Sequence, residues 1–277
     1  MIKKYKPTSA GIRFRKTLVK DVDKVRPEKS LVVPLKGPVG RGKGRISTRH
    51  RQRGAKKLYR IIDFKRNKLN ITAKVASIQD DPNRGPNIAL LHYIDGEKRY
   101  ILAPEGLQKG MTVVSGPSSE FSVGNALPLE NIPLGMEIHN VELNLHAGGV
   151  LARGAGGSAQ ILAKEGKYVN VKLPSGEVKK ILGKCYATLG SLGNADRRNA
   201  RAGKAGRKRH LGWRPAVRGV AIADPAEHPH GGSYKDNGIG MPSPKSPWGQ
   251  KTRGFKTRRR KRSSYSIVKG RPRGKER

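Results

Sequence analysis

Two histidines separated by a proline, His228 and His230, come nearer to a catalytic or metal-binding pattern than any other residues of this chain. A neutral imidazole can act as a general base or ligate a transition metal. A metal site needs further ligands, and only Asp224 and Glu227 lie close in the sequence. The Gly231-Gly232 pair favours a tight turn whose imidazoles form hydrogen bonds or stack on a planar group of a partner. We therefore predict a binding role for both histidines and keep His228 as the one candidate catalytic residue.

A glycine-rich segment, residues 37–44, approaches the pattern of a phosphate-binding nucleotide loop. Its last residue is glycine where magnesium binding needs Ser or Thr, and Pro34 weakens the strand expected before it. We therefore expect no nucleotide hydrolysis. Glycines still let backbone amides approach a phosphate chain closely, so we predict that Arg41, Lys43 and Arg45 bind nucleic acid.

Positive charge is concentrated at the two ends of the chain, whose net charge is +39. Residues 1–58 carry 19 basic and 3 acidic side chains, and residues 193–277 carry 24 and 5. Residues 59–192 carry only 16 and 12. Such cationic segments repel themselves in water and release condensed counterions when they bind a polyanion. The composition therefore predicts nucleic acid as the partner.

The composition also limits the class of protein and its compartment. Only 35% of the residues are apolar and 5% aromatic, which predicts a modest core. The longest apolar stretch, Ile88 to Ile94, is too short to cross a bilayer, and residues 1–7 lack the apolar region of a secretory signal. Cys185 is the only cysteine and is interpreted as a core residue. We expect a cytoplasmic protein with no membrane partner.

The central part of the chain has the pattern of short β-strands. Leu91–Ile94 and Arg99–Leu102 flank an Asp-Gly pair, a strong hairpin signal. Apolar and polar residues alternate over 141–146 and 169–173, and a Pro-Ser-Gly turn leads from the latter toward 178–181. Many short strands with frequent Gly and Pro predict small closed or partly closed barrels.

Two such barrels fit the length, with a seam within Asn125–Pro133. We predict an all-β core with a first barrel at 59–127, a second barrel at 128–192, and irregular basic extensions at 1–58 and 193–277. In the last extension 20 of 85 residues are Gly or Pro, which excludes long helices. A short helix from Asn194 to Ala202, capped by Asn194, is the exception we expect. The rest should become ordered only when bound.

Several short motifs then combine into one pattern that covers the chain. In chain order they are Tyr59–Lys68 (YRIIDFKRNK), Asp81–Arg84 (DPNR), Asp95–Pro104 (DGEKRYILAP), Gly124–Leu129 (GNALPL), Ala187–Gly190 (ATLG), Arg214–Gly219 (RPAVRG), His228–Gly232 (HPHGG) and Pro247–Gly249 (PWG). Their identity and order resemble the universal ribosomal protein L-two family of the large subunit, in particular its bacterial members.

The resemblance implies an OB-fold barrel followed by an SH3-like barrel and a primary rRNA-binding protein of the large subunit. It implies support for subunit association, tRNA binding, peptide bond formation and the architecture around the peptidyl transferase centre. The implied partners are large-subunit rRNA, small-subunit rRNA at the subunit interface and neighbouring ribosomal proteins. It implies no small-molecule substrate and no cofactor beyond structural Mg²⁺ associated with rRNA. His228 matches a position near the centre and is carried over without a catalytic role.

The predicted RNA-binding residues combine basic side chains of the motifs and extensions with polar and aromatic ones. They are Arg41, Lys43, Arg45, Arg60, Lys65, Arg66, Asn83, Arg84, Arg99, Arg153, Arg214, Arg218, His228, His230, Trp248, Arg258, Arg259 and Arg260. The sequence departs from the usual family pattern at Gln52–Lys56, Ser233–Asp236 and Gly85-Pro86. At the first two places the family's RNA contacts are not carried over, and the third is expected to stiffen its loop.

Two other classes of function compete with this interpretation. A general nucleic-acid compacting protein would bind DNA and RNA alike, but the patterned and almost neutral central part argues against it. An RNA-acting or peptidyl-transfer enzyme would depend on His228. We expect a non-enzymatic RNA-binding protein.

Overall fold

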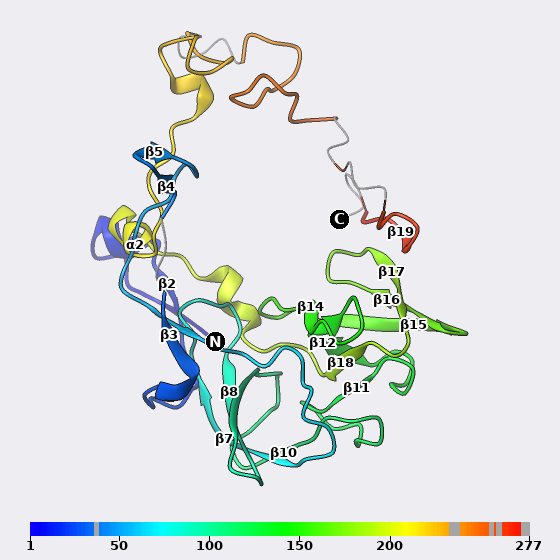
Figure 1. Cartoon of the computed structure of the whole chain (residues 1–277). Helices are drawn as coiled ribbons and strands as arrows, with labels where there is room; N and C mark the ends of the chain where they lie inside the picture. The colour runs from blue at the N-terminus through cyan, green and yellow to red at the C-terminus, as the bar shows by residue number, and fades with distance from the viewer. Residues whose placement is uncertain (36–38, 233–238, 255–257, 259–261, 273–277) are drawn as a thin grey trace. The chain divides into compact units, whose positions relative to one another are not determined.

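Figure 1 shows the computed structural model of the chain, which describes residues 1–35, 39–232, 239–254, 258 and 262–272. These residues form two compact units. The first comprises the described residues within 1–36, 56–205 and 262–277, and the second comprises those within 37–55 and 206–261. No helix within the described ranges has the length and hydropathy that spanning a bilayer requires.

The first barrel is built on an antiparallel four-stranded sheet. Its strands are β7 (Ala73–Gln79), β8 (Ile88–Tyr93), β9 (Lys98–Leu102) and β10 (Thr112–Val113), in the order β10-β7-β8-β9. The predicted hairpin is confirmed, because β8 and β9 pair from Ile88 opposite Leu102 to His92 opposite Lys98. Gly96 closes the turn with φ of 84°, a conformation that glycine adopts without strain.

Strand β8 is buried on both faces, which explains its continuous apolar sequence. On one face Ala89 and Leu91 pack with Val75 of β7. On the other face the side chains pack against segments outside the sheet, among them Ile62 and Leu192. The second face of this sheet is therefore covered by segments that precede and follow it in the chain.

The extension before the first barrel contains regular structure. Its elements are β1 (Ile2–Lys4), α1 (Ala10–Arg13), β2 (Lys16–Leu18), η1 (Lys29–Leu31) and β3 (Val32–Pro34). β1 pairs with β2, and β3 pairs with β6 (Leu58–Arg60). The buried Tyr100 hydroxyl accepts the Glu28 N–H at 3.0 Å and donates to Gln79 Oε1 at 3.0 Å, which ties this extension to the sheet.

The second barrel is a seven-stranded antiparallel sheet. Its strands are β11 (Ala126–Pro128), β12 (Glu137–His139), β15 (Ala159–Glu165), β16 (Tyr168–Lys172), β17 (Val178–Leu182), β18 (Tyr186–Leu189) and β19 (Ile267–Lys269), in the order β11-β18-β12-β15-β16-β17-β19. Leu127, Ile138 and Ile161 lie in its core. Cys185 lies there too, and burial raises the pKa of its thiol to about 11, as suits an unreactive core residue.

The predicted alternation over 141–146 is wrong from Glu142 onward. Strand β13 (Val141–Glu142) is only two residues long and pairs with β14 (Gly149–Leu151). Glu142 is buried, and its carboxylate accepts the Gly148 N–H at 2.9 Å and the Tyr186 N–H at 3.1 Å. These bonds hold a loop, and Leu145 within it is 40% exposed. The alternating pattern placed Glu142 on the solvent face, but its carboxylate is buried.

The segment after the second barrel differs in part from its prediction. A 3₁₀ helix, η2 (Ala195–Asn199), replaces the expected helix. Asn194 does not cap it, because its backbone is left-handed (φ of 70°) and its side chain donates to the Gly85 carbonyl at 2.8 Å. β19, which the sequence did not predict, pairs with β17 at the edge of the second sheet (Figure 1).

The second unit contains few regular elements among its described residues. They are β4 (Arg41–Gly42), β5 (Arg45–Ile46), α2 (Ala205–His210), which begins at the last residue of the first unit, and η3 (Gly219–Ala221). β4 and β5 form a hairpin whose central residues, Lys43 and Gly44, both have positive φ. That geometry fits a two-residue hairpin turn and differs from the strand, loop and helix of a nucleotide-binding site.

The core is therefore all-β, as predicted, and it agrees with an OB-fold barrel followed by an SH3-like barrel. Ala126 and Leu127 already pair with β18 of the second sheet. The exact division of the two barrels after residue 127, and the bounds of the extensions, stay predictions.

A buried histidine makes the stability of this core depend on pH. Burial lowers the pKa of His139 to about 4, and its Nδ1 bonds to the Gly190 carbonyl at 2.7 Å. The folded pKa lies below the ordinary 6.5, so the stabilising effect of the neutral ring is present above pH 6.5 and is lost as pH falls toward 4.

Urea unfolding should show this loss as about 2 kcal/mol between pH 7 and pH 5. His139→Asn keeps a donor for Gly190 but cannot titrate, so its unfolding free energy should change less over the same range. Identical pH dependence in the two proteins would contradict this assignment.

Candidate nucleic-acid interface

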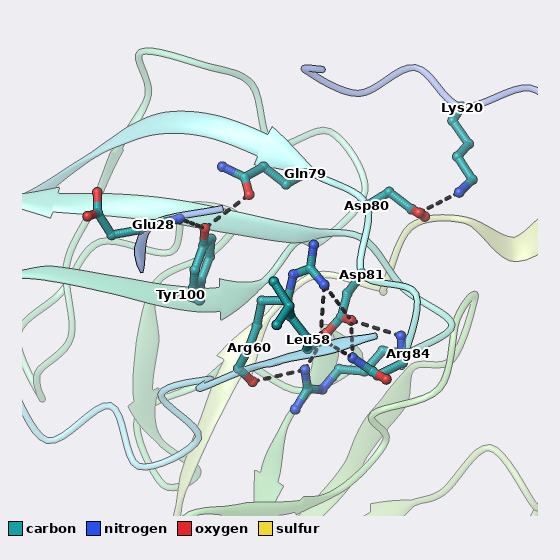
Figure 2. A network of polar contacts seen from close by, with 10 residues as sticks. Lys20, Glu28, Leu58, Arg60, Gln79, Asp80, Asp81, Arg84 and Tyr100 are labelled. Atoms are coloured by element: carbon teal, nitrogen blue, oxygen red, sulfur yellow. Dashed lines mark hydrogen bonds and ion pairs between the residues drawn. The ribbon is translucent and has the colours of Figure 1, made fainter. Parts of the chain in front are cut away.

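The loop that follows β7 is organised around one buried carboxylate, that of Asp81 (Figure 2). Its Oδ1 accepts the backbone N–H of Asn83 at 2.8 Å and the Asn83 side-chain amide at 3.1 Å. Its Oδ2 pairs with the Arg84 guanidinium. A buried charge is tolerated only when it is paired and hydrogen-bonded, so Asp81 determines where these two side chains lie.

The same network fixes the loop to strand β6. The Arg84 Nη1 donates to the Arg60 carbonyl at 3.2 Å, and the Asn83 amide donates to the Leu58 carbonyl at 2.6 Å. Arg60 donates to the Leu58 carbonyl at 3.0 Å, and its Nη1 lies 4.0 Å from Asp81 Oδ1. Three predicted RNA-binding residues, Arg60, Asn83 and Arg84, are thus brought together.

Two of the predicted arginines lie over aromatic rings beside this network. The Arg84 guanidinium lies 4.7 Å from the centre of the Tyr59 ring, and that of Arg153 lies 4.6 Å from the centre of the Phe64 ring. Such contacts favour a guanidinium over the ring face and restrict its motion. We call Tyr59, Phe64, Arg84 and Arg153 the arginine–aromatic cluster.

Hydrogen bonds connect Phe64 of this cluster to the second barrel, and the Asp81 loop to η2. The Phe64 carbonyl accepts the Gly149 N–H at 2.8 Å, and the Gly85 carbonyl accepts the Arg197 Nη1 at 3.2 Å. A Cβ at position 85 would lie 3.1 Å from the Ala155 Cβ. Glycine at this departure from the family pattern therefore allows the loop to approach residue 155 closely.

Arg99 and Lys65 have different environments. The Arg99 guanidinium pairs with Asp63 at 2.9 Å and with Glu97 at 2.6 Å. Hydrogen bonds from Arg99 and Lys68 lower the pKa of Glu97 to about 2. Lys65 is exposed. The charge of Arg99 is thus partly neutralised within the protein, whereas that of Lys65 is available at the surface.

Arg66 lies inside the molecule rather than on its surface. Its side chain is buried and its Nη2 donates to the Gly124 carbonyl at 3.1 Å. Burial lowers the pKa of this guanidinium. RNA could reach Arg66 only if the surrounding structure opened, so we leave it out of the interface proposed below and regard it as a residue that shapes the protein.

In the second unit the predicted basic residues are exposed. Arg41, Lys43 and Arg45 lie on the β4–β5 hairpin, and Arg214 and Arg218 lie on either side of an irregular segment.

Two arginines that the sequence analysis did not predict lie over the tryptophan rings of this unit. Arg51 lies 3.7 Å from the centre of the Trp213 ring system and Arg49 lies 4.9 Å from that of Trp248. Trp248 is 76% exposed, as a base-stacking role requires. The sequence signal for these contacts was a pair of arginines two residues apart, Arg49 and Arg51, in a chain with two tryptophans.

The two histidines form a local turn, as the sequence predicts. The Gly231 N–H donates to the His228 carbonyl at 2.7 Å, and the His230 N–H donates to His228 Nδ1 at 3.0 Å. His230 is buried, and its Nε2 accepts the Lys245 N–H at 2.7 Å. Within the described residues, no three His, Cys, Asp or Glu side chains gather as a metal site requires. Both rings are therefore engaged in holding the backbone.

The remaining predicted positions lie in the last basic segment. Arg258 is exposed. Arg259 and Arg260, together with the departure at Ser233–Asp236, lie outside the described residues.

The buried carboxylate can be tested by a matched pair of substitutions. Asp81→Asn should lower the free energy of unfolding by about 3 kcal/mol, because it leaves a largely buried Arg84 without its counter-ion. Asp80→Asn removes the more exposed ion pair with Lys20 and should cost less than about 1 kcal/mol. Urea unfolding of both variants provides the measurement, and equal losses would contradict the central role of Asp81.

Two family models match most of this chain. Residues 28–115 match the family described as Ribosomal Proteins L2, RNA binding N-terminal domain, and residues 122–249 match Ribosomal Proteins L2, C-terminal domain. The first match contains the Asp81 network, and the second contains the second barrel up to β18 and the histidine turn. The chain therefore belongs to the ribosomal protein L2 family and is a structural, RNA-binding protein of the large ribosomal subunit.

Proposed function

We propose that this chain is a primary binder of large-subunit rRNA that organises RNA near the peptidyl transferase centre. In this role it supports subunit association, tRNA binding and peptide bond formation in cytoplasmic ribosomes. The observation that carries the proposal is the arginine–aromatic cluster, in which arginines are fixed on aromatic rings beside a buried carboxylate. The basic extensions supply the charge that a large RNA surface requires.

The form of the cluster suits RNA better than a protein or a small molecule. An A-form RNA duplex has a deep, narrow major groove, so proteins contact its backbone, its 2′-hydroxyls and its unpaired bases. Guanidinium groups bind phosphates through paired N–H donors and also stack on bases. We propose that the exposed Arg153 contacts the RNA backbone or an unpaired base, while Asn83 and the largely buried side chains of Arg60 and Arg84 hold the loop beside it.

The second unit is proposed to provide further contacts of the same kind. Exposed cations on the β4–β5 hairpin suit phosphates, and Trp248 suits an unpaired base. Contacts with small-subunit rRNA and neighbouring ribosomal proteins belong to the same proposal. We propose that the chain needs no cofactor of its own and that structural Mg²⁺ is held with the RNA.

The proposal leaves the chemistry of peptide bond formation to the RNA. A general base needs a free ring nitrogen near the proton that it removes. The His228 Nδ1 already accepts the His230 N–H, and the His228 ring packs against Gly219, where a Cβ would lie only 2.4 Å from the ring. These contacts support a structural role for His228 in shaping the turn.

Arg153 offers the cleanest test, because it is exposed and its side chain is held by the Phe64 ring. Arg153→Ala should weaken binding of the full chain to a large-subunit rRNA transcript about tenfold. Lys184→Ala removes one exposed charge from the same barrel and should change the affinity much less. Filter binding at a fixed salt concentration gives both values.

Arg153→Lys separates charge from shape, because lysine keeps the charge but lacks the planar fork. We expect it to recover only part of the affinity. Unchanged binding in Arg153→Ala, or equal losses in Arg153→Ala and Lys184→Ala, would refute a specific role of the cluster.

A further inference from the structure

A cavity of about 430 Å³ lies in the first unit and shares no lining residue with the arginine–aromatic cluster. β1, β2 and the segment around η2 form its walls. It is lined by Ile2, Lys4, Lys16, Asp196, Arg198, Asn199 and Arg201. Four of these seven side chains are cations, and none of them belongs to the RNA-binding residues predicted from the sequence.

Three of the cations stand in a row across neighbouring chain segments. Lys4 of β1 is directly opposite Lys16 of β2. Lys16 is in turn paired with Arg201, through its N–H to the Arg201 carbonyl at 3.1 Å and the Arg201 N–H to its carbonyl at 2.9 Å. Directly opposed residues project from the same face of a sheet, and adjacent strands are about 4.8 Å apart. Three positive charges therefore lie side by side.

This row is unfavourable in the protein alone, because like charges on directly opposed residues destabilise a strand pair. Asp196 is the one acidic residue of the lining, and its carboxylate pairs with the Met1 amino group at 2.9 Å. Over the described ranges no carboxylate lies within ion-pair distance of Lys4, Lys16, Arg198 or Arg201. The cavity therefore concentrates positive charge that the protein leaves uncompensated.

We propose that this cavity binds consecutive phosphates of an rRNA strand, with Lys4, Lys16 and Arg201 as the row that neutralises them and Arg198 beside it. The inference rests on the RNA-binding function proposed above and adds a defined phosphate subsite to it. Lysine contributes a compact charge, and arginine contributes paired donors that match phosphate oxygens. Asn199 adds an amide to the lining. A row of charges suits a chain of phosphates better than a single anion.

Lys4→Glu tests the subsite because it should lower the affinity for RNA without lowering the stability of the protein. In the RNA-free chain the new carboxylate faces Lys16 and replaces a repulsive pair by an attractive one. The midpoint of thermal unfolding should therefore be unchanged or higher. Affinity for a large-subunit rRNA transcript should fall about tenfold, and the slope of log affinity against log salt should become less steep by about 1.

Lys24→Glu is the matched control, since Lys24 is an exposed lysine of the same extension outside the cavity. It should lower the affinity less than Lys4→Glu. Equal losses would show that only the total charge of the extension matters and would overturn the subsite.

The outcomes separate the subsite from the function on which it rests. If the unmodified chain binds RNA tightly and Lys4→Glu binds equally well, the subsite is refuted and the RNA-binding function stands. If the unmodified chain does not bind the transcript, the proposed function itself fails. If inorganic pyrophosphate stabilises the unmodified chain but not Lys4→Glu, while their RNA affinities are equal, the cavity takes a free anion and the assignment to RNA is overturned.

Discussion

The buried carboxylate of Asp81 is the interaction on which the proposed RNA-binding surface depends. A strongly basic protein has difficulty in holding arginines close together, because the guanidinium groups repel each other. Here one acid in the interior accepts hydrogen bonds from Asn83 and pairs with Arg84, and the loop is thereby fixed to β6 (Figure 2). The cost of burying that charge is offset only while these partners stay in place. The local arrangement is therefore set by the protein before RNA is bound.

Aromatic rings complete this arrangement in a similar way in both units. Arg84 and Arg153 lie over Tyr59 and Phe64 in the first unit. Arg51 and Arg49 lie over tryptophans in the second. A guanidinium on a ring loses less side-chain freedom on binding than a free lysine does, so more of the interaction energy remains for the RNA. Tyr59, Phe64 and the two tryptophans thus help to position charge.

The sequence predicted those parts of the fold that depend on local patterns. The Asp-Gly hairpin between β8 and β9 and the turn between β16 and β17 are confirmed, because their signals lie within a few residues. The alternation from Glu142 onward was misleading, since burial of that acid depends on the amides of Gly148 and of Tyr186, the latter 44 residues away. β19 was missed for the same reason, because a short apolar pair becomes a strand only beside β17.

The same difference between local patterns and long-range contacts applies to the candidate site. The motif residues Arg60, Asn83 and Arg84 are brought together, but no sequence pattern indicated that Asp81 would be buried beneath them. The burial of Arg66 was equally hidden, since its bond to Gly124 joins residues 58 positions apart. The phosphate subsite proposed at Lys4, Lys16 and Arg201 also depends on pairing between distant segments. Residue types thus indicated the ligand, whereas the geometry came from long-range contacts.

The central claim is that the Asp81 loop is already ordered in the free protein. Amide hydrogen exchange of the RNA-free full chain tests it directly at the N–H groups of Asn83 and Arg84, which bond to the Asp81 carboxylate at 2.8 Å and the Asp81 carbonyl at 3.2 Å. Exchange at both amides should be much slower than in an unstructured chain and should change little when rRNA is added. Exchange at the unstructured rate without RNA, with protection only in the complex, would contradict the account.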